Sequence, residues 1–169
     1  TPVARIQGMA EILARSGADP SLVSVILQST DELNSFISGI LELTRIESNK
    51  LQLHKTSKDI NKIIDACVSK FKVQIQARQI TIKTDLEPLF PIKIDVELLT
   101  KVISNLIDNA IKYSPEQSTI SIESRESSEN PGFVEISIRD TGFGIDPKDL
   151  DSLFSKFFRP KNDITLQTK

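Results

Sequence analysis

Apolar residues in the first part of the chain recur at steps of three and four residues, which is the spacing of an amphipathic helix. The first run ends before the segment SGADP, where Gly17 stops a helix and Pro20 suits a first helical turn. A second run continues to about Ser48. The first run comprises Val3, Ile6, Ala10 and Leu13, and the second Leu22, Val25, Ile26, Ser29, Leu33, Phe36, Ile37, Ile40, Leu41 and Thr44. Two helices joined by a short turn predict an antiparallel hairpin.

The apolar stripe of the second predicted helix is too long for the first helix to cover. A stripe left uncovered in this way favours packing against a second hairpin. We therefore expect residues 1–49 to form a homodimer, in which two hairpins close a four-helix bundle.

The pattern changes near residue 50 to short alternating runs broken by turn residues. Helical spacing returns over 59–77 and over 95–113, the latter with Asp95 as its N-cap. Period-two alternation predicts three strands with one buried face each, over 80–86, 118–125 and 133–139. This mixture predicts an α/β two-layer sandwich over 50–169, so that the fold class of the whole chain is α+β.

The composition is that of a chain that folds in water. Of its 169 residues, 38% are apolar and 26% are charged. A net charge of −2 leaves no basic footprint, so nucleic-acid binding is not expected. No apolar run approaches the roughly 18 residues of a membrane span, and no signal-peptide pattern is present, so no membrane contact is expected from this segment. The single cysteine, Cys67, excludes an internal disulfide and a thiolate-cluster zinc site, which favours a cytoplasmic setting.

The predicted helix over 95–113 has an apolar side and an unusual polar face. Its apolar side comprises Val96, Leu99, Val102, Ile103, Leu106, Ile107 and Ala110. Asparagine is a mediocre helix former, yet Asn105 and Asn109 are placed one turn apart, and with Lys101 and Lys112 they fall within about 80° of one another. Amide oxygens are neutral hard ligands that suit Mg²⁺, and a lysine offsets phosphate charge. A site for a phosphorylated ligand is one interpretation, and a plain solvated face is the other.

The segment DTGFGI at 140–145 directly follows the last predicted strand. Glycine accepts positive φ angles and lets a ligand approach the backbone closely, so Asp-x-Gly-x-Gly at a strand end indicates a site. A tight turn is the alternative. The segment is not a Walker loop, because no Gly-Lys-Ser/Thr follows and no helix is expected immediately after it.

Three motifs, taken in order, resemble the N, G1 and F boxes of sensor histidine kinases. They are NLIDNAIKYS at 105–114, DTGFGI at 140–145 and FSKFFR at 154–159. Thr1-Pro2 is similar to the end of the family's H-E-x-x-T-P phosphoacceptor motif, and LELTRIESNKL at 41–51 to the usual exit from its second helix. The resemblance implies a dimerisation and phosphotransfer hairpin over 1–49, followed over 50–169 by an ATP-binding catalytic domain of the type shared with gyrase, Hsp90 and MutL.

The resemblance also implies which residues bind Mg²⁺ and ATP. Asn109 would coordinate Mg²⁺, with Asn105 close by. Lys112 and Arg159 would contact the phosphates of ATP, and Tyr113 would lie against the adenine.

The resemblance further implies roles for the segment at 140–145, for the residues after Phe158 and for Thr1. Asp140 would accept a hydrogen bond from the adenine amino group, and Gly142 with Gly144 would let the purine lie against the backbone. Residues after Phe158 would begin a mobile lid over ATP. The hydroxyl of Thr1 would orient water during dephosphorylation of a response regulator, although a helix N-terminal threonine before proline is as good an interpretation.

The sequence departs from the family pattern at both ends. The phosphorylated histidine would precede Thr1 by four residues, and the glycine-rich G2 box does not occur before Lys169. Residues 1–169 alone are therefore expected to be inactive in autophosphorylation. The only histidine, His54, is expected to be a solvent-exposed bystander in a linker or edge strand.

Three functions are compatible with these motifs: a histidine kinase, an ATP hydrolase of the gyrase or chaperone type, and a non-catalytic dimerisation or nucleotide-binding module. In the hydrolases a glutamate that activates water stands one turn before the Mg²⁺ asparagine, where this chain has Asn105. An amide cannot serve as a general base near neutral pH, whereas transfer to a neutral imidazole needs none beside ATP. The resemblance therefore implies a two-component histidine kinase that passes phosphate from ATP to a histidine and then to an aspartate of a response-regulator receiver domain.

Overall fold

The computed structural model describes residues 2–48, 52–155 and 158. The chain divides into two compact units, Thr1–Leu53 and His54–Lys169. None of the helices among the described residues is long and apolar enough to cross a membrane.

The first unit is a helical hairpin, as predicted. Helix α1 (Pro2–Arg15) ends where Gly17 adopts a φ of 83° and the N–H of Ala18 donates to the carbonyl of Leu13 at 3.1 Å, an arrangement that satisfies the helix end. Helix α2 (Pro20–Glu47) begins after Asp19, whose carboxylate accepts from the Ser21 hydroxyl and N–H, and these bonds lower the pKa of Asp19.

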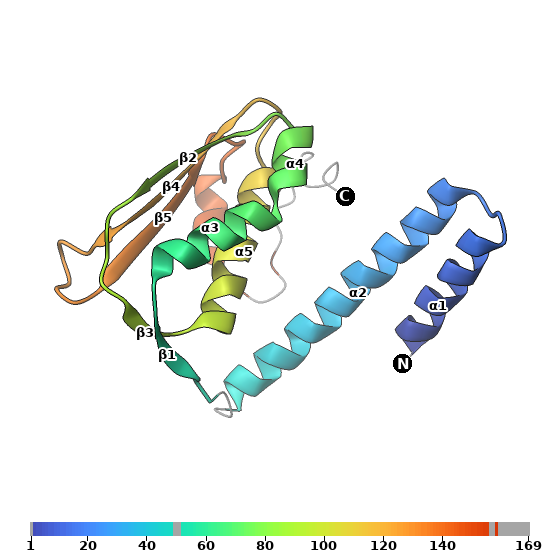
Figure 1. The fold of residues 1–169 in the computed structure, drawn as a ribbon, viewed down its shortest axis with the longest axis horizontal. Helices are drawn as coiled ribbons and strands as arrows, with labels where there is room; N and C mark the ends of the chain where they lie inside the picture. Colours follow the sequence, from blue (N-terminus) through green and yellow to red (C-terminus); the bar gives the residue numbers. More distant parts are fainter. Residues whose placement is uncertain (1, 49–51, 156–157, 159–169) are drawn as a thin grey trace. The chain divides into compact units, whose positions relative to one another are not determined.

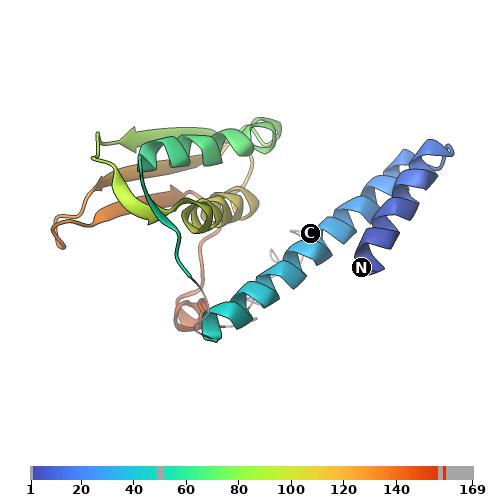
Figure 2. The same ribbon diagram turned by 60° about the horizontal axis from the view of Figure 1, so that its bottom comes forward.

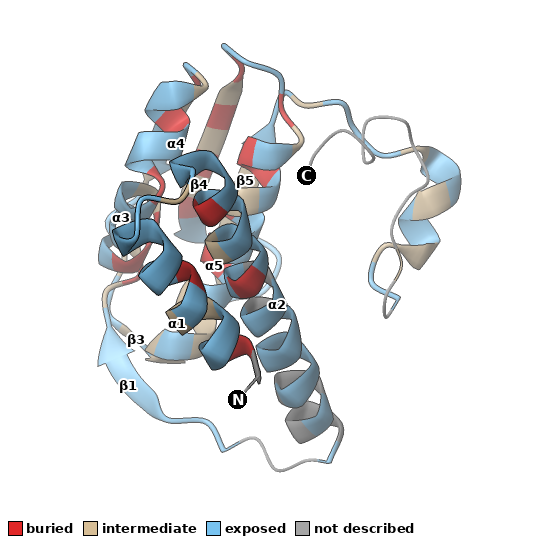
Figure 3. Cartoon of the chain, turned by 90° about the vertical axis from the view of Figure 1, so that its right-hand side faces the viewer, coloured by how far each residue is buried: buried red, intermediate tan, exposed pale blue. Residues whose placement is uncertain are grey.

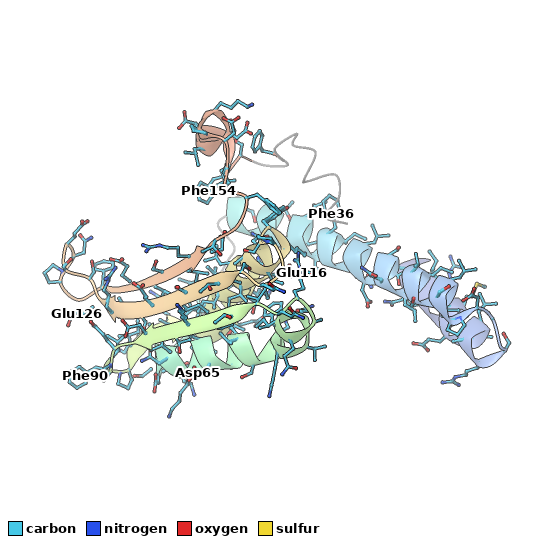
Figure 4. The ribbon with its side chains drawn as sticks, turned by 90° about the horizontal axis from the view of Figure 1, so that it is seen from above. Phe36, Asp65, Phe90, Glu116, Glu126 and Phe154 are labelled. Carbon is cyan, nitrogen blue, oxygen red and sulfur yellow. The ribbon has the colours of Figure 1, made fainter. Side chains whose placement is uncertain are left out.

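Few side chains are buried between α1 and α2. Among the side chains that the structure describes, the buried ones are Val3, Ala10, Val23 and Thr30, and the Gln7 side chain donates to Asp31 across the pair at 2.7 Å. Most of the large apolar residues of the hairpin are left exposed, as Figure 4 shows for Phe36. They are Ile6, Met9, Ile12, Leu13, Leu22, Val25, Ile26, Leu33, Phe36, Ile37, Ile40 and Leu41.

The described residues of the second unit form an α/β sandwich with two small sheets (Figure 1). In the larger sheet, β4 (Thr119–Glu126) lies between β2 (Thr81–Leu86), to which it is parallel, and β5 (Val134–Asp140), to which it is antiparallel. The smaller sheet pairs β1 (Lys55–Lys58) with β3 (Ile92–Asp95) in antiparallel fashion.

A helical layer covers one face of the larger sheet (Figure 2). It contains α3 (Ile60–Lys70), α4 (Lys72–Ala77) and α5 (Val96–Lys112), and a short 3₁₀ helix, η1 (Pro147–Ser152), follows the sheet. The core lies between the two layers, as the buried positions in Figure 3 show. Its members include Ile60, Ile64, Cys67, Ile103, Ile107, Ala110, Ile120 and Ile122.

Two features of this fold differ from the sequence prediction. The helix predicted over 59–77 is broken at Phe71, whose N–H bonds to the carbonyl of Val68 in a tighter turn before α4 begins. Strands β1 and β3 were not predicted, because each has only four residues and β1, KTSK, contains no apolar residue. His54 is exposed and directly precedes β1, which agrees with a linker position.

The cap predicted for helix α5 is confirmed. Asp95 accepts from the N–H of Leu98 at 3.2 Å through one carboxylate oxygen and from the N–H of His54 at 2.8 Å through the other. These two bonds, chiefly the one from His54, lower the pKa of the Asp95 carboxyl group. The carboxylate therefore joins the start of the second unit to the first turn of α5.

Candidate functional site

Helix α5 supplies one side of the candidate site. Its buried face, which includes Ile103, Ile107 and Ala110, packs into the core, while Asn105 and Asn109 are exposed on the other side. The periodicity wrongly placed Val102 and Leu106 on the buried side, since their exposed fractions are 54% and 47%. The apolar residues of α5 occupy a wider arc of the helix surface than the sheet and α3 cover. The two asparagines therefore share an exposed stripe with two aliphatic side chains, which suits a ligand with polar and apolar parts.

Lys112 has an acidic neighbour on the same helix. Its ammonium lies 2.6 Å from the carboxylate of Asp108, one turn earlier. Asp108 was not among the residues predicted for the site, although a lysine four residues after an aspartate on a helix is a visible signal. Because both side chains keep contact with solvent, the pair can open to receive a phosphate at small cost.

Strand β5 supplies the opposite side of the site. Asp140 is paired in register with Ile120, and it continues the alternation of Ile136 and Ile138 on the face of the sheet that the helices cover. Asp140 itself is exposed because it is the last residue of the strand. The Asp140 carboxylate therefore faces the helices and is open to solvent, so a polar group of a ligand can reach it.

Backbone hydrogen bonds join the segment after β5 to the end of α5. The N–H of Phe143 donates to the carbonyl of Tyr113 at 3.1 Å, and the N–H of Gly142 donates to the Asp140 carboxylate at 2.8 Å. The Thr141 hydroxyl accepts from the N–H of Thr119 at 3.1 Å, which fixes the same segment to β4. The motifs at 105–114 and 140–145 are thereby brought together.

Gly142 and Gly144 are each required to be glycine, but for different structural reasons. A Cβ atom on Gly142 would lie 2.4 Å from the carbonyl oxygen of Tyr113 and 2.6 Å from the carboxylate of Asp140, so no side chain fits there. Gly144 has open space around it but adopts a φ of 71°, which strains other residues.

The remaining predicted residues are less informative. Tyr113 is half-buried at the C-cap of α5. Phe154 projects into solvent beyond η1 (Figure 4), with an exposed fraction of 95%. Thr1 and Arg159 lie outside the described residues. Only Asp146 separates the segment at 140–145 from the short 3₁₀ helix η1, where the sequence predicted no helix immediately after the segment.

The residues present fit a magnesium nucleotide. Asn109 offers one amide oxygen, which suits an ion that takes most of its ligands from phosphates and water. Asp140, whose carboxylate accepts from the N–H of Gly142, is exposed and can also accept a hydrogen bond from a ligand amino group.

Two family models match the chain. Residues 94–168 match the family described as "Histidine kinase-, DNA gyrase B-, and HSP90-like ATPase", and residues 1–49 match the "His Kinase A (phospho-acceptor) domain". The chain belongs to the sensor histidine kinases. The sensor-like histidine kinase SenX3 of Mycobacterium tuberculosis is 31% identical over 163 residues, covering 94% of this chain and 39% of SenX3. The chain thus spans about two fifths of the length of this curated relative.

Solved structures share the fold of this sensor kinase segment. Full-length ShkA in complex with AMPPNP superimposes with a TM-score of 0.74 at 24% identity, covering 88% of this chain and 32% of ShkA. Histidine kinase ThkA in complex with response regulator protein TrrA gives 0.68 at 22% identity, covering 94% of this chain and 47% of ThkA. These likenesses confirm the predicted fold class, a helical hairpin followed by an α/β sandwich.

Proposed function

We propose that the second unit binds Mg-ATP between α5 and the end of β5, and that the complete protein is an ATP-dependent histidine kinase. In it, the γ-phosphate passes to a histidine and then to an aspartate of a response-regulator receiver domain. The observation that carries the proposal is the bond from Phe143 to Tyr113, because it joins the two polar motifs at one place. The proposal is also supported by solved structures of the same fold, one in complex with AMPPNP and one in complex with a response regulator.

The proposed division of labour follows the two units. Residues 1–49 serve dimerisation and phosphotransfer, and residues 50–169 bind ATP. Asn109, with Asn105 beside it, would hold Mg²⁺, which neutralises phosphate charge when bound. Lys112 and Arg159 would contact the phosphates.

The adenine would be recognised at the other end of the site. Asp140 would accept a hydrogen bond from the adenine amino group, and Tyr113 would lie against the ring. Gly142 and Gly144 would let the purine lie against the backbone. Thr1 is proposed to orient water when the regulator is dephosphorylated.

Hydrolysis of ATP is the less favoured alternative. The residue one turn before Asn109 is Asn105, and both side chains are exposed on the same face of α5. An amide there provides no general base for water. Phosphate release without any phosphohistidine would favour the hydrolase over the kinase.

Incubation of the complete protein with γ-labelled ATP tests the kinase proposal. Acid-labile label should map to a histidine other than His54, and the His54→Gln variant should be labelled as well as the parent, because His54 is a solvent-exposed residue outside the hairpin. A receiver domain added afterwards should remove the label from the kinase. Label on His54, or no phosphohistidine at all, would contradict the proposal.

The hairpin is expected to dimerise through its exposed apolar side chains. Ile37→Asp should weaken the dimer at least tenfold, because a buried aliphatic side chain contributes roughly 1.5–3 kcal/mol and an unpaired charge is costly to bury. Light scattering over a concentration series measures the dissociation constant. Val73→Asp is the matched control, since Val73 lies exposed on α4 of the other unit. Equal dimerisation by Ile37→Asp and the parent would contradict this interface.

A further inference from the structure

The end of helix α5 has no glycine cap of the usual kind. Its C-cap residue, Tyr113, has a φ of −96° and a ψ of 8°, and its N–H makes the last helical bond, to the carbonyl of Asn109 at 2.9 Å. The carbonyls that follow in the last turn have no helical N–H to accept from. They need donors from elsewhere in the fold.

A single side chain supplies most of those donors. The Arg78 guanidinium donates through Nη1 to the carbonyl of Ile111 and, at 3.4 Å, to that of Lys112, and through Nη2 to that of Ser114 at 3.0 Å. The carbonyl between them, on Tyr113, accepts from Phe143 instead. Four consecutive carbonyls at the end of α5 therefore accept hydrogen bonds, three from Arg78 and one from the segment at 140–145.

Charge adds to this arrangement. The C-terminal end of a helix carries a partial negative charge, which a cation stabilises. A guanidinium also presents several donors in a fixed plane, so that it can span three carbonyls, whereas a lysine ammonium is a single point.

Arg78 is itself held in place. It is the C-cap of α4, and its carbonyl accepts from the N–H of Gln117 at 3.1 Å. The Gln117 side chain donates to that of Gln79 at 2.9 Å, and both glutamines adopt positive φ angles. The turn after α4 and the turn before β4 thus form one fixed base for the guanidinium.

We propose that Arg78 is a positioning residue for the nucleotide site, acting through the carbonyls at the end of α5. The inference rests on the proposed function. If the end of α5 shifts, the Tyr113 carbonyl leaves the N–H of Phe143, and the segment with Gly142 loses its attachment to the helix. Displacements of about 1 Å in a binding site are costly even when they originate away from the ligand.

The test compares Arg78→Gln and Arg78→Lys with the parent in the complete protein. Calorimetry with AMPPNP and Mg²⁺ should show affinity reduced at least tenfold by Arg78→Gln and reduced less by Arg78→Lys. Without nucleotide, the amide of Phe143 should exchange faster in Arg78→Gln, while the core amide of Ile122 changes little. Arg125→Gln is the matched control, because Arg125 pairs with Glu135 at 3.1 Å on an exposed part of the sheet.

The possible results distinguish a failure of the proposed function from a failure of the role inferred for Arg78. A parent that fails to bind AMPPNP overturns the proposed function and this inference together. Normal binding by the parent and by Arg78→Gln overturns the inference alone, even if the melting temperature falls, because Arg78 is then only structural. If Arg78→Gln does not fold at the assay temperature, Arg78→Lys decides, and parental affinity with parental Phe143 exchange in that variant overturns the inference.

Discussion

Asp140→Ala and Asn109→Ala should each weaken binding of Mg-ATP by about 5- to 150-fold, which corresponds to about 1–3 kcal/mol for a hydrogen bond to a charged or buried partner. Asp140 is the exposed carboxylate at a helix-facing position of β5, and Asn109 lies on the open face of α5. The two losses would have different causes, because Asp140 is proposed to bind the adenine and Asn109 the metal ion.

Chelation of magnesium separates the two causes. With EDTA present, the difference between Asn109→Ala and the parent should disappear, whereas the deficit of Asp140→Ala should persist. Calorimetry in both buffers measures this, and Asp65→Ala, which removes an exposed carboxylate from α3, is the control. Parental affinity in both site variants would show that the residue roles are wrong.

Gly142→Ala should abolish nucleotide binding and lower the stability of the second unit. Its Cβ would lie 2.4 Å from a backbone oxygen, that of Tyr113, which cannot move without displacing the end of α5. Overpacking of this kind costs about 1–3 kcal/mol. Thermal unfolding and calorimetry measure the two effects.

Gly39→Ala is the matched control for that substitution. Gly39 lies inside α2, and a Cβ there would meet nothing within 4 Å. Alanine in a helix interior is more stable than glycine by roughly 0.5–1 kcal/mol, so this variant should melt slightly higher and bind nucleotide normally. A Gly142→Ala variant that behaves like Gly39→Ala would contradict the close approach at Tyr113.

Long periodic segments were predictable from the sequence, and short or non-periodic features were not. Helix α5 and strands β4 and β5 carry clear patterns over seven or more residues. Strand β1 has four exposed residues and is defined only by its partner β3. Periodicity also overstated the buried arc of α5, because the width of the covering layer decides whether Val102 is buried.

The polar part of the site divides in the same way. Asn105, Asn109 and Asp140 could be proposed from the sequence because they stand at fixed spacings or directly after a strand. Arg78 could not, since its partners are main-chain carbonyls more than thirty residues away, and every residue type has a carbonyl. Contacts between a side chain and a distant backbone leave no pattern in a single sequence.

The parallel pairing of β2 with β4 makes folding of the second unit depend on contacts between residues far apart in sequence. Thr81 pairs with Thr119, so the chain between them, which includes β3 and α5, must cross from one end of the sheet to the other. Non-local pairing of this kind slows folding, whereas the α1–α2 hairpin needs only contacts near in sequence. A newly made chain would therefore present the exposed apolar stripe of the hairpin before the proposed nucleotide site has formed, and two chains would be able to associate while their second units are still unfolded.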